Sequence, residues 1–340
     1  MRVRTLLVWC FLLACAPAWA QSGQQRARAA GSDLVGTPAP RLVLKTIDGQ
    51  TLDLGRLYGK QAVYLKFWAT WCVPCREQMP HLERTFEQAG PNLAVIAINA
   101  GFDDTLADVQ RYRRELGLKM PIVLDDGTLG QAFRLRVTPQ HIVIGRDGRI
   151  QYVGHLADAR LDAALAAAQA PAATVADAKG APVDLPPIGI GDRVPALAAS
   201  TLDGAPFRLR DGGRPTVLAF LSPWCETYLD GKRAGARPAL AASCRAAREQ
   251  VDALAQRHPD VRWLGVASGL WATPGELREY RKAYGVTIPL TLDAAGTWFR
   301  AFRVMHVPTL LLIDRQGRLA RRLEGVGPQF EAELKALSAP

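Results

Sequence analysis

The sequence has few cysteines, methionines and histidines, and each shortage excludes a class of protein. Its 340 residues include 6 cysteines, 4 methionines and 5 histidines. So few cysteines cannot build the dense disulfide scaffold of a small secreted domain. No Met-rich patch of the kind that holds copper is present, and His81, His141, His155 and His258 do not cluster at metal-binding or catalytic spacing.

Long apolar segments and long charged runs are also missing. Beyond residue 20, no stretch has the ~20 consecutive apolar residues that a membrane-spanning helix needs. The formal net charge is +10, but the basic residues are spread along the chain without a run of five or six. This pattern favours a solvated basic surface over a nucleic-acid site, while an attraction to acidic partners or to an anionic membrane face stays open.

The first twenty residues, MRVRTLLVWCFLLACAPAWA, have the features of a signal peptide. Arg2 and Arg4 precede an apolar run, and residues 18–20 fit a small-x-small cleavage site. We therefore expect removal of residues 1–20, a net charge of +8 (10 − 2) and a periplasmic location. An alternative is a lipobox ending at Cys15, whose acylation would make the protein a lipoprotein; only then would the membrane be a partner.

The two halves of the chain repeat each other. The segment GTPAPRLVLKTIDGQTLDL (36–54) aligns with GDRVPALAASTLDGAPFRL (191–209), an offset of 155 residues (191 − 36). A period this long indicates duplicated domains, because solenoid repeats span about 20–50 residues. We expect a signal peptide, a disordered lead-in, a first domain, an Ala/Pro-rich linker and a second domain at residues 1–20, 21–33, 34–168, 169–187 and 188–338.

Apolar periodicity predicts an α/β fold in each half. Continuous apolar runs at residues 62–68 and 217–221 are typical of a central strand buried on both faces. Strands alternate with helices and end in a hairpin, so we expect two tandem domains with a mixed central sheet flanked by helices. In the first half the further segments are strands at 93–98, 122–124, 142–144 and 150–153, and helices near 106–116 and 156–168.

Cys72 and Cys75 form a Cys-x-x-Cys pair directly after the first central strand. As a structural disulfide the pair would close a very short loop and add little stability. As a metal site it lacks the second pair of ligands that structural zinc needs, although two thiolates can bind Cu(I). As a redox couple it is well placed, because a cysteine at a helix N-terminus is favoured as a thiolate and its neighbour one turn on can complete the exchange. Pro74 fits the first turn, where its missing N–H costs nothing.

With its flanks YLKFWAT and REQMP, the pair resembles the thioredoxin-like proteins of the TlpA/ResA type. The resemblance covers residues 34–168 well and 188–338 more weakly. It implies an exported or membrane-tethered thiol–disulfide oxidoreductase in which Cys72 attacks and Cys75 resolves. It also implies a cis-proline loop at 137–139 that binds the substrate peptide, so we assign Trp71, Thr138 and Pro139 to substrate binding, with Trp71 partly exposed beside a water-accessible Cys72.

Two positions depart from the family. Where many relatives have a proton-handling glutamate this chain has Gln78, with Glu77 one residue earlier. Where thioredoxin has a buried aspartate, six residues before the first cysteine, it has Lys66. A buried Lys66 would lower the thiol pKa, whereas a lysine that extends to water would have no effect, and we favour the second. Lys66, Pro74 and Glu77 are supporting residues in this interpretation.

The resemblance favours a periplasmic protein-disulfide reductase over an oxidant. It implies resupply by a membrane electron donor, disulfide-containing client proteins and no cofactor or metal beyond the Cys72–Cys75 disulfide. Cytochrome c biogenesis, through apocytochrome c, is one client pathway that it suggests. The alternative is a Cu(I)- or thiol-peptide-binding module, or a redox-sensing scaffold without turnover.

The second copy keeps Cys225 at the attacking position, but Tyr228 replaces the resolving cysteine. Cys244 is a candidate partner in a segment that lengthens this copy. Three interpretations stay open: a structural Cys225–Cys244 cross-link, a redox pair in which Cys244 resolves Cys225, and a degenerate domain that only binds a substrate or partner. Pro308 matches the cis-proline position, with His306 beside it as a loop residue.

Overall fold

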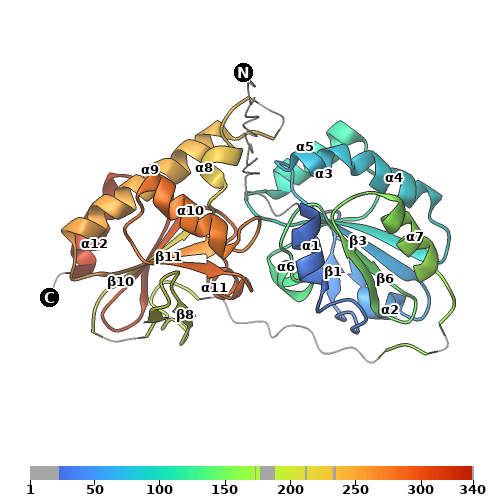
Figure 1. The fold of residues 1–340 in the computed structure, drawn as a ribbon, viewed down its shortest axis with the longest axis horizontal. Coiled ribbons are helices and arrows are strands. Elements are labelled where there is room, and N and C mark those ends of the chain that lie inside the picture. The colour runs from blue at the N-terminus through green and yellow to red at the C-terminus, as the bar shows by residue number, and fades with distance from the viewer. Residues whose placement is uncertain (1–22, 173, 177–187, 211–212, 233–234, 339–340) are drawn as a thin grey trace, which may run out of the picture.

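Two α/β halves lie side by side, each built around a twisted sheet with helices on its faces (Figure 1). The computed structural model describes residues 23–172, 174–176, 188–210, 213–232 and 235–338. The expected signal peptide, and residues 173 and 177–187 of the expected linker, lie outside the described residues. Among the described helices, none has the length and apolar character that crossing a membrane requires.

The first half contains a five-stranded sheet in the order β5-β4-β3-β6-β7. β4 and β5 run parallel to β3, and β6 and β7 are antiparallel to their neighbours. The strands of this half, including the opening hairpin β1–β2, are β1 (Val43–Lys45), β2 (Thr51–Asp53), β3 (Ala62–Trp68), β4 (Leu93–Asn99), β5 (Ile122–Leu124), β6 (Gln140–Ile144) and β7 (Ile150–Gly154). Its helices are α1 (Gly23–Gly31), α2 (Leu54–Leu57), α3 (Val73–Glu77), α4 (Met79–Gln88), α5 (Leu106–Leu116), α6 (Thr128–Ala132) and α7 (Ala159–Ala168).

The second half repeats this topology in the order β12-β11-β10-β13-β14. The match confirms the predicted fold class of two mixed sheets flanked by helices. Its strands are β8 (Ala198–Ser200), β9 (Pro206–Arg208), β10 (Thr216–Leu221), β11 (Arg262–Ser268), β12 (Leu290–Asp293), β13 (Thr309–Ile313) and β14 (Leu319–Glu324). Its helices are α8 (Cys225–Tyr228), α9 (Pro238–Arg257), α10 (Pro274–Tyr284), α11 (Thr297–Ala301) and α12 (Pro328–Ser338).

The central strand β3 forms where its apolar run predicts, and every one of its residues is buried. Side chains alternate between the two faces of a strand. Tyr64 and Trp68 therefore join the core that contains the cysteines, while Val63, Leu65 and Phe67 join the core on the opposite face. Burial on both faces is the physical reason for a continuous apolar run without a polar alternation.

The prediction of a disordered lead-in is wrong for residues 23–33. Residues 23–31 form helix α1, which packs against β7. Ala27 and Ala30, one turn apart, are buried against this strand, and a Cβ added to Gly31 would come within 2.7 Å of Val153. The helix therefore buries little apolar area but approaches the sheet closely through small side chains, a pattern that mean composition does not reveal.

Lys66 is fully buried, so the expectation that it extends to water is wrong. Its exposed fraction is 0%, and Nζ has no hydrogen-bond partner among the described residues. Lys66 lies between Tyr64 and Trp68 on the cysteine-bearing face of β3, opposite His141 of β6. Desolvation by burial lowers the pKa of the Lys66 amine from 10.5 to about 7.

We predict that Lys66→Met stabilises the protein at neutral and mildly acidic pH. Between pH 7 and 10.5 the unfolded state keeps the proton that the folded state loses, so wild-type stability rises with pH across that window. The variant should gain a few kcal/mol at pH ~6, since one pKa unit corresponds to about 1.4 kcal/mol, and the gain should shrink towards pH ~10. Calorimetric unfolding at several pH values tests this, with the exposed Lys60→Met as control. Equal pH profiles for wild type and Lys66→Met would contradict it.

Candidate active site

Cys72 and Cys75 form a disulfide with an S–S distance of 2.10 Å at the start of α3. Cys72 is the N-cap residue, and its Sγ accepts a hydrogen bond from the Cys75 N–H at 3.2 Å. Pro74 occupies the first turn, as expected from its missing N–H. Since β3 ends at Trp68, the pair sits at the carboxyl end of the central strand.

The Thr138–Pro139 peptide bond is cis, as the resemblance implies. This bond immediately precedes β6, whose Gln140 pairs with Phe67 near the end of β3. The register therefore places the cis-proline loop at the same end of the sheet as Cys72. Thr138 and Pro139, both assigned to substrate binding, are buried here.

A chain of buried and part-buried hydrogen bonds connects the cysteine helix to the cis-proline loop. Gln78, which ends α3, accepts at Oε1 from His141 Nε2 at 2.9 Å and donates through Nε2 to the His155 carbonyl at 3.3 Å. With Nε2 protonated, His141 Nδ1 accepts from the Tyr64 hydroxyl at 2.8 Å. Burial, and then the charge of Lys66, hold the pKa of His141 well below 6.5, which keeps the ring neutral. His155 donates from Nδ1 to the Pro139 carbonyl at 2.7 Å.

His141 is the functional candidate that sequence reasoning missed. From the sequence alone, an isolated histidine in a strand is interpreted as a packing residue. Its hydrogen bond to Gln78 depends on the folded arrangement of β6 beside α3. The only signal was indirect: Gln78 is a neutral amide at the position where the family resemblance implies a glutamate. Glu77, by contrast, is exposed at the surface of α3.

The second half covers Cys72, so the expectation of a water-accessible cysteine and a partly exposed Trp71 is wrong. Cys72 is only 1% exposed and Trp71 is also buried. The Trp71 ring stacks on Trp224, with centroids 4.7 Å apart, and the Val73 N–H donates to the Tyr228 hydroxyl at 3.2 Å. Tyr228, the residue that replaces a resolving cysteine, therefore touches the residue next to Cys72.

The two halves meet with approximate two-fold symmetry. The Asp103 N–H donates to the Met305 carbonyl, and the Trp271 N–H donates to the Arg136 carbonyl, at 2.8 and 2.9 Å. Asp103 and Trp271 both have the positive φ that side chains rarely adopt, at 56° and 57°. The Trp271 indole also donates to Thr138 Oγ1 at 3.1 Å, so the second half contacts the cis-proline loop as well.

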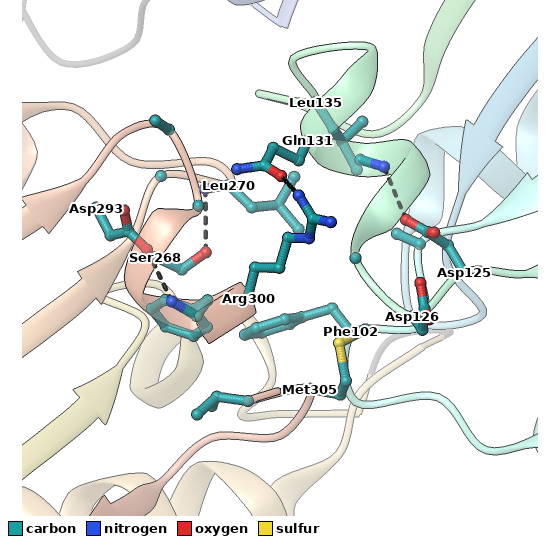
Figure 2. A pocket seen from close by; sticks show the side chains of 18 of the residues that line it. Phe102, Asp125, Asp126, Gln131, Leu135, Ser268, Leu270, Asp293, Arg300 and Met305 are labelled. Atoms are coloured by element: carbon teal, nitrogen blue, oxygen red, sulfur yellow. Dashed lines mark hydrogen bonds between the residues drawn. The ribbon is translucent and has the colours of Figure 1, made fainter. Parts of the chain in front are cut away.

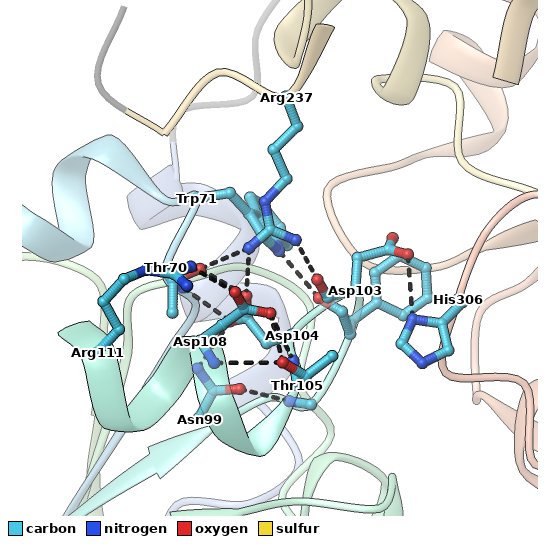
Figure 3. Close-up of polar contacts among 12 residues, drawn as sticks. Thr70, Trp71, Asn99, Asp103, Asp104, Thr105, Asp108, Arg111, Arg237 and His306 are labelled. Atoms are coloured by element: carbon cyan, nitrogen blue, oxygen red, sulfur yellow. Dashed lines mark hydrogen bonds and ion pairs between the residues drawn. The ribbon is translucent and has the colours of Figure 1, made fainter. Parts of the chain in front are cut away.

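Arg237 of the second half forms an ion pair with the buried Asp104 carboxylate of the first half (Figure 3). Its guanidinium donates to Asp104 Oδ1 and Thr70 Oγ1, both at 2.7 Å, and also to the Asp103 carbonyl. The Asp104 side chain is completely buried and also accepts from the Asn99 side chain at 2.8 Å. A buried carboxylate depends on its counter-charge, so Arg237 holds the second half in place over Cys72.

Asp103 and His306 form a second, titratable contact at this interface. The Asp103 carboxylate lies 3.5 Å from His306 Nδ1 and accepts from the Val307 N–H at 3.2 Å. The hydrogen bond to Asp103 raises the pKa of His306, and desolvation by burial raises the pKa of Asp103. His306, expected to be a loop residue without a role, thus contacts the first half beside the second cis-proline.

Cys225 and Cys244 are joined in a disulfide with an S–S distance of 1.98 Å and a Cα–Cα distance of 6.3 Å. Cys225 is the first residue of α8 and Cys244 lies on α9. The Val307–Pro308 bond is cis and precedes β13, whose Thr309 pairs with Phe220 near the end of β10. The second half therefore reproduces the arrangement of disulfide and cis-proline at one end of its sheet.

A separate cavity of about 100 Å³ lies between α6 and α11 (Figure 2). Phe102, Leu270 and Met305 supply much of its apolar lining. Its carboxylates already have partners, since Asp125 and Asp293 each accept the N–H groups at the start of the following helix. No cysteine lines the cavity, so we attribute it to the packing of the two halves.

We predict that Arg237→Ala exposes Cys72. Removing the guanidinium leaves Asp104 buried without its counter-charge, so the interface should open to hydrate this carboxylate. After reduction, alkylation of Cys72 by a maleimide should be faster in the variant than in wild type. Arg245→Ala, which breaks the exposed pair with Asp230, is the matched control and should match wild type. Equal rates for all three proteins would contradict this role of Arg237.

We also predict that raising the pH loosens the interface. The raised pKa of His306 means that its contact with Asp103 is fully formed below the ordinary histidine pKa and is lost as the pH rises through the raised value. His306 is 44% exposed, so screening limits this contribution to about 1 kcal/mol. Small-angle scattering should give a larger radius of gyration at pH ~9 than at pH ~6. His306→Gln should lack this step; an unchanged pH dependence in that variant would contradict the assignment.

The match to a known protein family lies in the first half of the chain. The AhpC/TSA family matches residues 35–153. The thiol-disulfide oxidoreductase ResA of Halalkalibacterium halodurans is 37% identical over 117 residues, which are 34% of this chain and 65% of that protein. ResA of Bacillus thuringiensis is 30% identical over 132 residues, 38% of this chain and 75% of that protein.

Among solved structures, MTB dsbF is 27% identical with a TM-score of 0.35; the match covers 43% of this chain and 99% of dsbF. The match to H. halodurans ResA spans just under two thirds of that relative's length. The family match and the ResA relatives, together with a Cys-x-x-Cys disulfide at the end of a central strand, identify the family. The chain belongs to the ResA-like, thioredoxin-fold thiol-disulfide oxidoreductases.

Proposed function

We propose that this protein is an exported protein-disulfide reductase whose working couple is Cys72–Cys75. The observation that carries the proposal is the position of this disulfide: at the start of α3, at the end of β3, and at the same sheet edge as the cis Thr138–Pro139 bond. The signal-peptide-like residues 1–20 support export to the periplasm, with a lipid anchor at Cys15 as the alternative.

In the proposed reaction the reduced Cys72 thiolate attacks a client disulfide and forms a mixed disulfide. One client cysteine leaves as a thiolate. Cys75 then loses its proton, attacks Cys72 Sγ and releases the second client thiolate, which leaves Cys72–Cys75 oxidised. A membrane electron donor restores the dithiol. Apocytochrome c and other disulfide-containing periplasmic proteins are candidate clients, and the reaction needs no cofactor or metal beyond the two sulfurs.

Several neighbouring groups support these steps. Water, the buried amine of Lys66 and the exposed carboxylate of Glu77 are the candidate acceptors for the Cys75 proton. Because the pKa of Lys66 is about 7, the amine can take up a proton near neutral pH. The neutral His141, held by Gln78, ties α3 to β6 and so fixes the cysteine helix relative to the cis-proline loop.

Access to Cys72 requires the two halves to separate locally. The contacts that hold them include the Arg237 cluster, the Asp103–His306 pair, the ion pair between Arg26 and Glu276, and the Trp71–Trp224 stack. Interfaces between domains with so much polar character favour relative motion. Trp71, Thr138 and Pro139 become available to a client peptide only in the separated arrangement.

We predict that Cys72→Ser lowers the rate of insulin-disulfide reduction by dithiothreitol to the uncatalysed rate. Without the Cys72 thiol no mixed disulfide can form. Cys75→Ser should instead accumulate mixed disulfides with protein substrates, visible on a non-reducing gel and lost on reduction. Insulin reduction that persists at the wild-type rate in Cys72→Ser would refute the proposal. Tight Cu(I) binding by the reduced protein together with negligible turnover would favour a copper-binding module instead.

A further inference from the structure

The disulfide of the second half lies close to the covered face of Cys72. Trp224, which stacks on Trp71, directly precedes Cys225, and Tyr228, which accepts from the Val73 N–H, ends the four-residue helix that Cys225 begins. Each tryptophan also donates its indole N–H to a carbonyl of its own half, Phe102 or Leu270, at 2.9 Å. The two Trp-Cys segments therefore face each other across the interface in equivalent settings.

Few thiols from outside can reach either disulfide in this arrangement. Cys72 is 1% exposed, and Cys225 and Cys75 are fully buried. Cys244 is 8% exposed and lines a cavity of about 30 Å³ together with Arg248, Tyr280 and Pro308. All residues that line this cavity belong to the second half, whereas Cys225 directly follows Trp224, which stacks on Trp71.

We propose that Cys225–Cys244 is a second redox-active disulfide that exchanges electrons with Cys72–Cys75 inside the same chain. This inference rests on the proposed function, in which Cys72 is the attacking thiol. In this inference the attacking cysteine of the second half is Cys225 and the resolving cysteine is Cys244. The resolving cysteine therefore lies on α9, whereas in a Cys-x-x-Cys pair it would be residue 228.

The exchange balances without an added oxidant or reductant. The Cys72 thiolate bonds to Cys225 Sγ, the Cys225–Cys244 bond breaks, and Cys244 leaves as a thiolate. Cys75 loses its proton to water and attacks Cys72, and Cys225 leaves as the second thiolate. Both released thiolates take up protons from water. The first pair is thereby oxidised by two electrons and the second pair is reduced by two; the reverse sequence returns them.

The second half is built so that opening its disulfide does not release α8. Glu226, next to Cys225, is buried and receives two hydrogen bonds from Arg248 Nε and one from Arg248 Nη2, at 3.0 to 3.2 Å. The Tyr280 hydroxyl donates to the same carboxylate at 2.8 Å. These bonds tie α8 to α9 and α10 independently of sulfur. The cavity beside Cys244 gives its sulfur room to move away, which a close-packed interior does not otherwise allow.

The Cys75→Ser variant of residues 21–340, which lacks the thiols of Cys10 and Cys15, tests the exchange directly. Its single free thiol in the first half, Cys72, faces an intact Cys225–Cys244 disulfide. Incubated at pH ~8 without oxidant, then quenched with acid, alkylated and mapped by mass spectrometry, it should yield a Cys72–Cys225 linkage with Cys244 alkylated. The linked fraction should not depend on protein concentration. The matched control, Cys75→Ser with Cys225→Ser, should contain no linked Cys72.

Two results would overturn the proposal. In the first, the Cys75→Ser variant keeps Cys225–Cys244 intact and Cys72 free at all times, as a purely structural cross-link would. In the second, Cys72 becomes linked to Cys244 instead of to Cys225.

A second measurement uses the proteins with Cys75 intact. Dithiothreitol should reduce Cys225–Cys244 at least ~10-fold more slowly in Cys72→Ser than in wild type, because the route through Cys72 is lost. Equal rates would also overturn the relay.

These outcomes separate the relay from the proposed function. If insulin reduction requires Cys72 but Cys225–Cys244 never exchanges, the reductase proposal stands and the relay fails. If insulin reduction does not require Cys72, the reductase proposal fails, and the mapping experiment still reports whether the two pairs exchange.

Discussion

The burial of the Asp104 carboxylate determines how this molecule is arranged. Asp104 lies in the first half, directly behind the Trp71–Cys72 turn, and accepts from Thr70 and Asn99 of the same half. These neutral donors do not supply a counter-charge, and the cation that pairs with Asp104, Arg237, belongs to the second half. A carboxylate out of contact with water needs that cation, so the first half is electrostatically complete only when the second half lies against it. The covering of Cys72 follows from this requirement.

The duplicated fold explains why the covering surface fits. Both halves have the same strand order, and both place a tryptophan, a cysteine and a cis-proline at one end of the sheet. Two equivalent surfaces can pair about an approximate two-fold axis, as the backbone bonds of Asp103 and Trp271 do. The Cys-to-Tyr difference at position 228 fits this pairing, because the tyrosine side chain is long enough to offer its hydroxyl to the backbone N–H of Val73. What looks in the sequence like the loss of a resolving cysteine is a contact between halves in the structure.

Much of each half could be predicted from the sequence, because local patterns determine it. The limits of β3 follow from an uninterrupted apolar run, and the Cys225–Cys244 pairing was one of a small number of options. The failures share a different cause. The burial of Lys66, the packing of α1 and the role of Arg237 depend on contacts between segments far apart in the chain: Arg237 is 133 residues from Asp104. A lysine within an apolar strand and a cation in a loop have ordinary surface interpretations until the partner segment is in place.

A single interface then links the two proposed activities. Its contacts combine ion pairs, aromatic packing and backbone hydrogen bonds between two halves that each have their own sheet, which allows opening and closing without unfolding either half. In the closed arrangement Cys72 faces the segment that carries Cys225 and is shielded from clients; in an open arrangement the same sulfur faces solvent and the cis-proline loop is free to bind a peptide. One molecule therefore cannot exchange disulfides with its own second half and with a client at the same moment. Because one nucleophile serves both, the fraction of closed molecules, and not the chemistry of Cys72 alone, determines which partner receives its electrons.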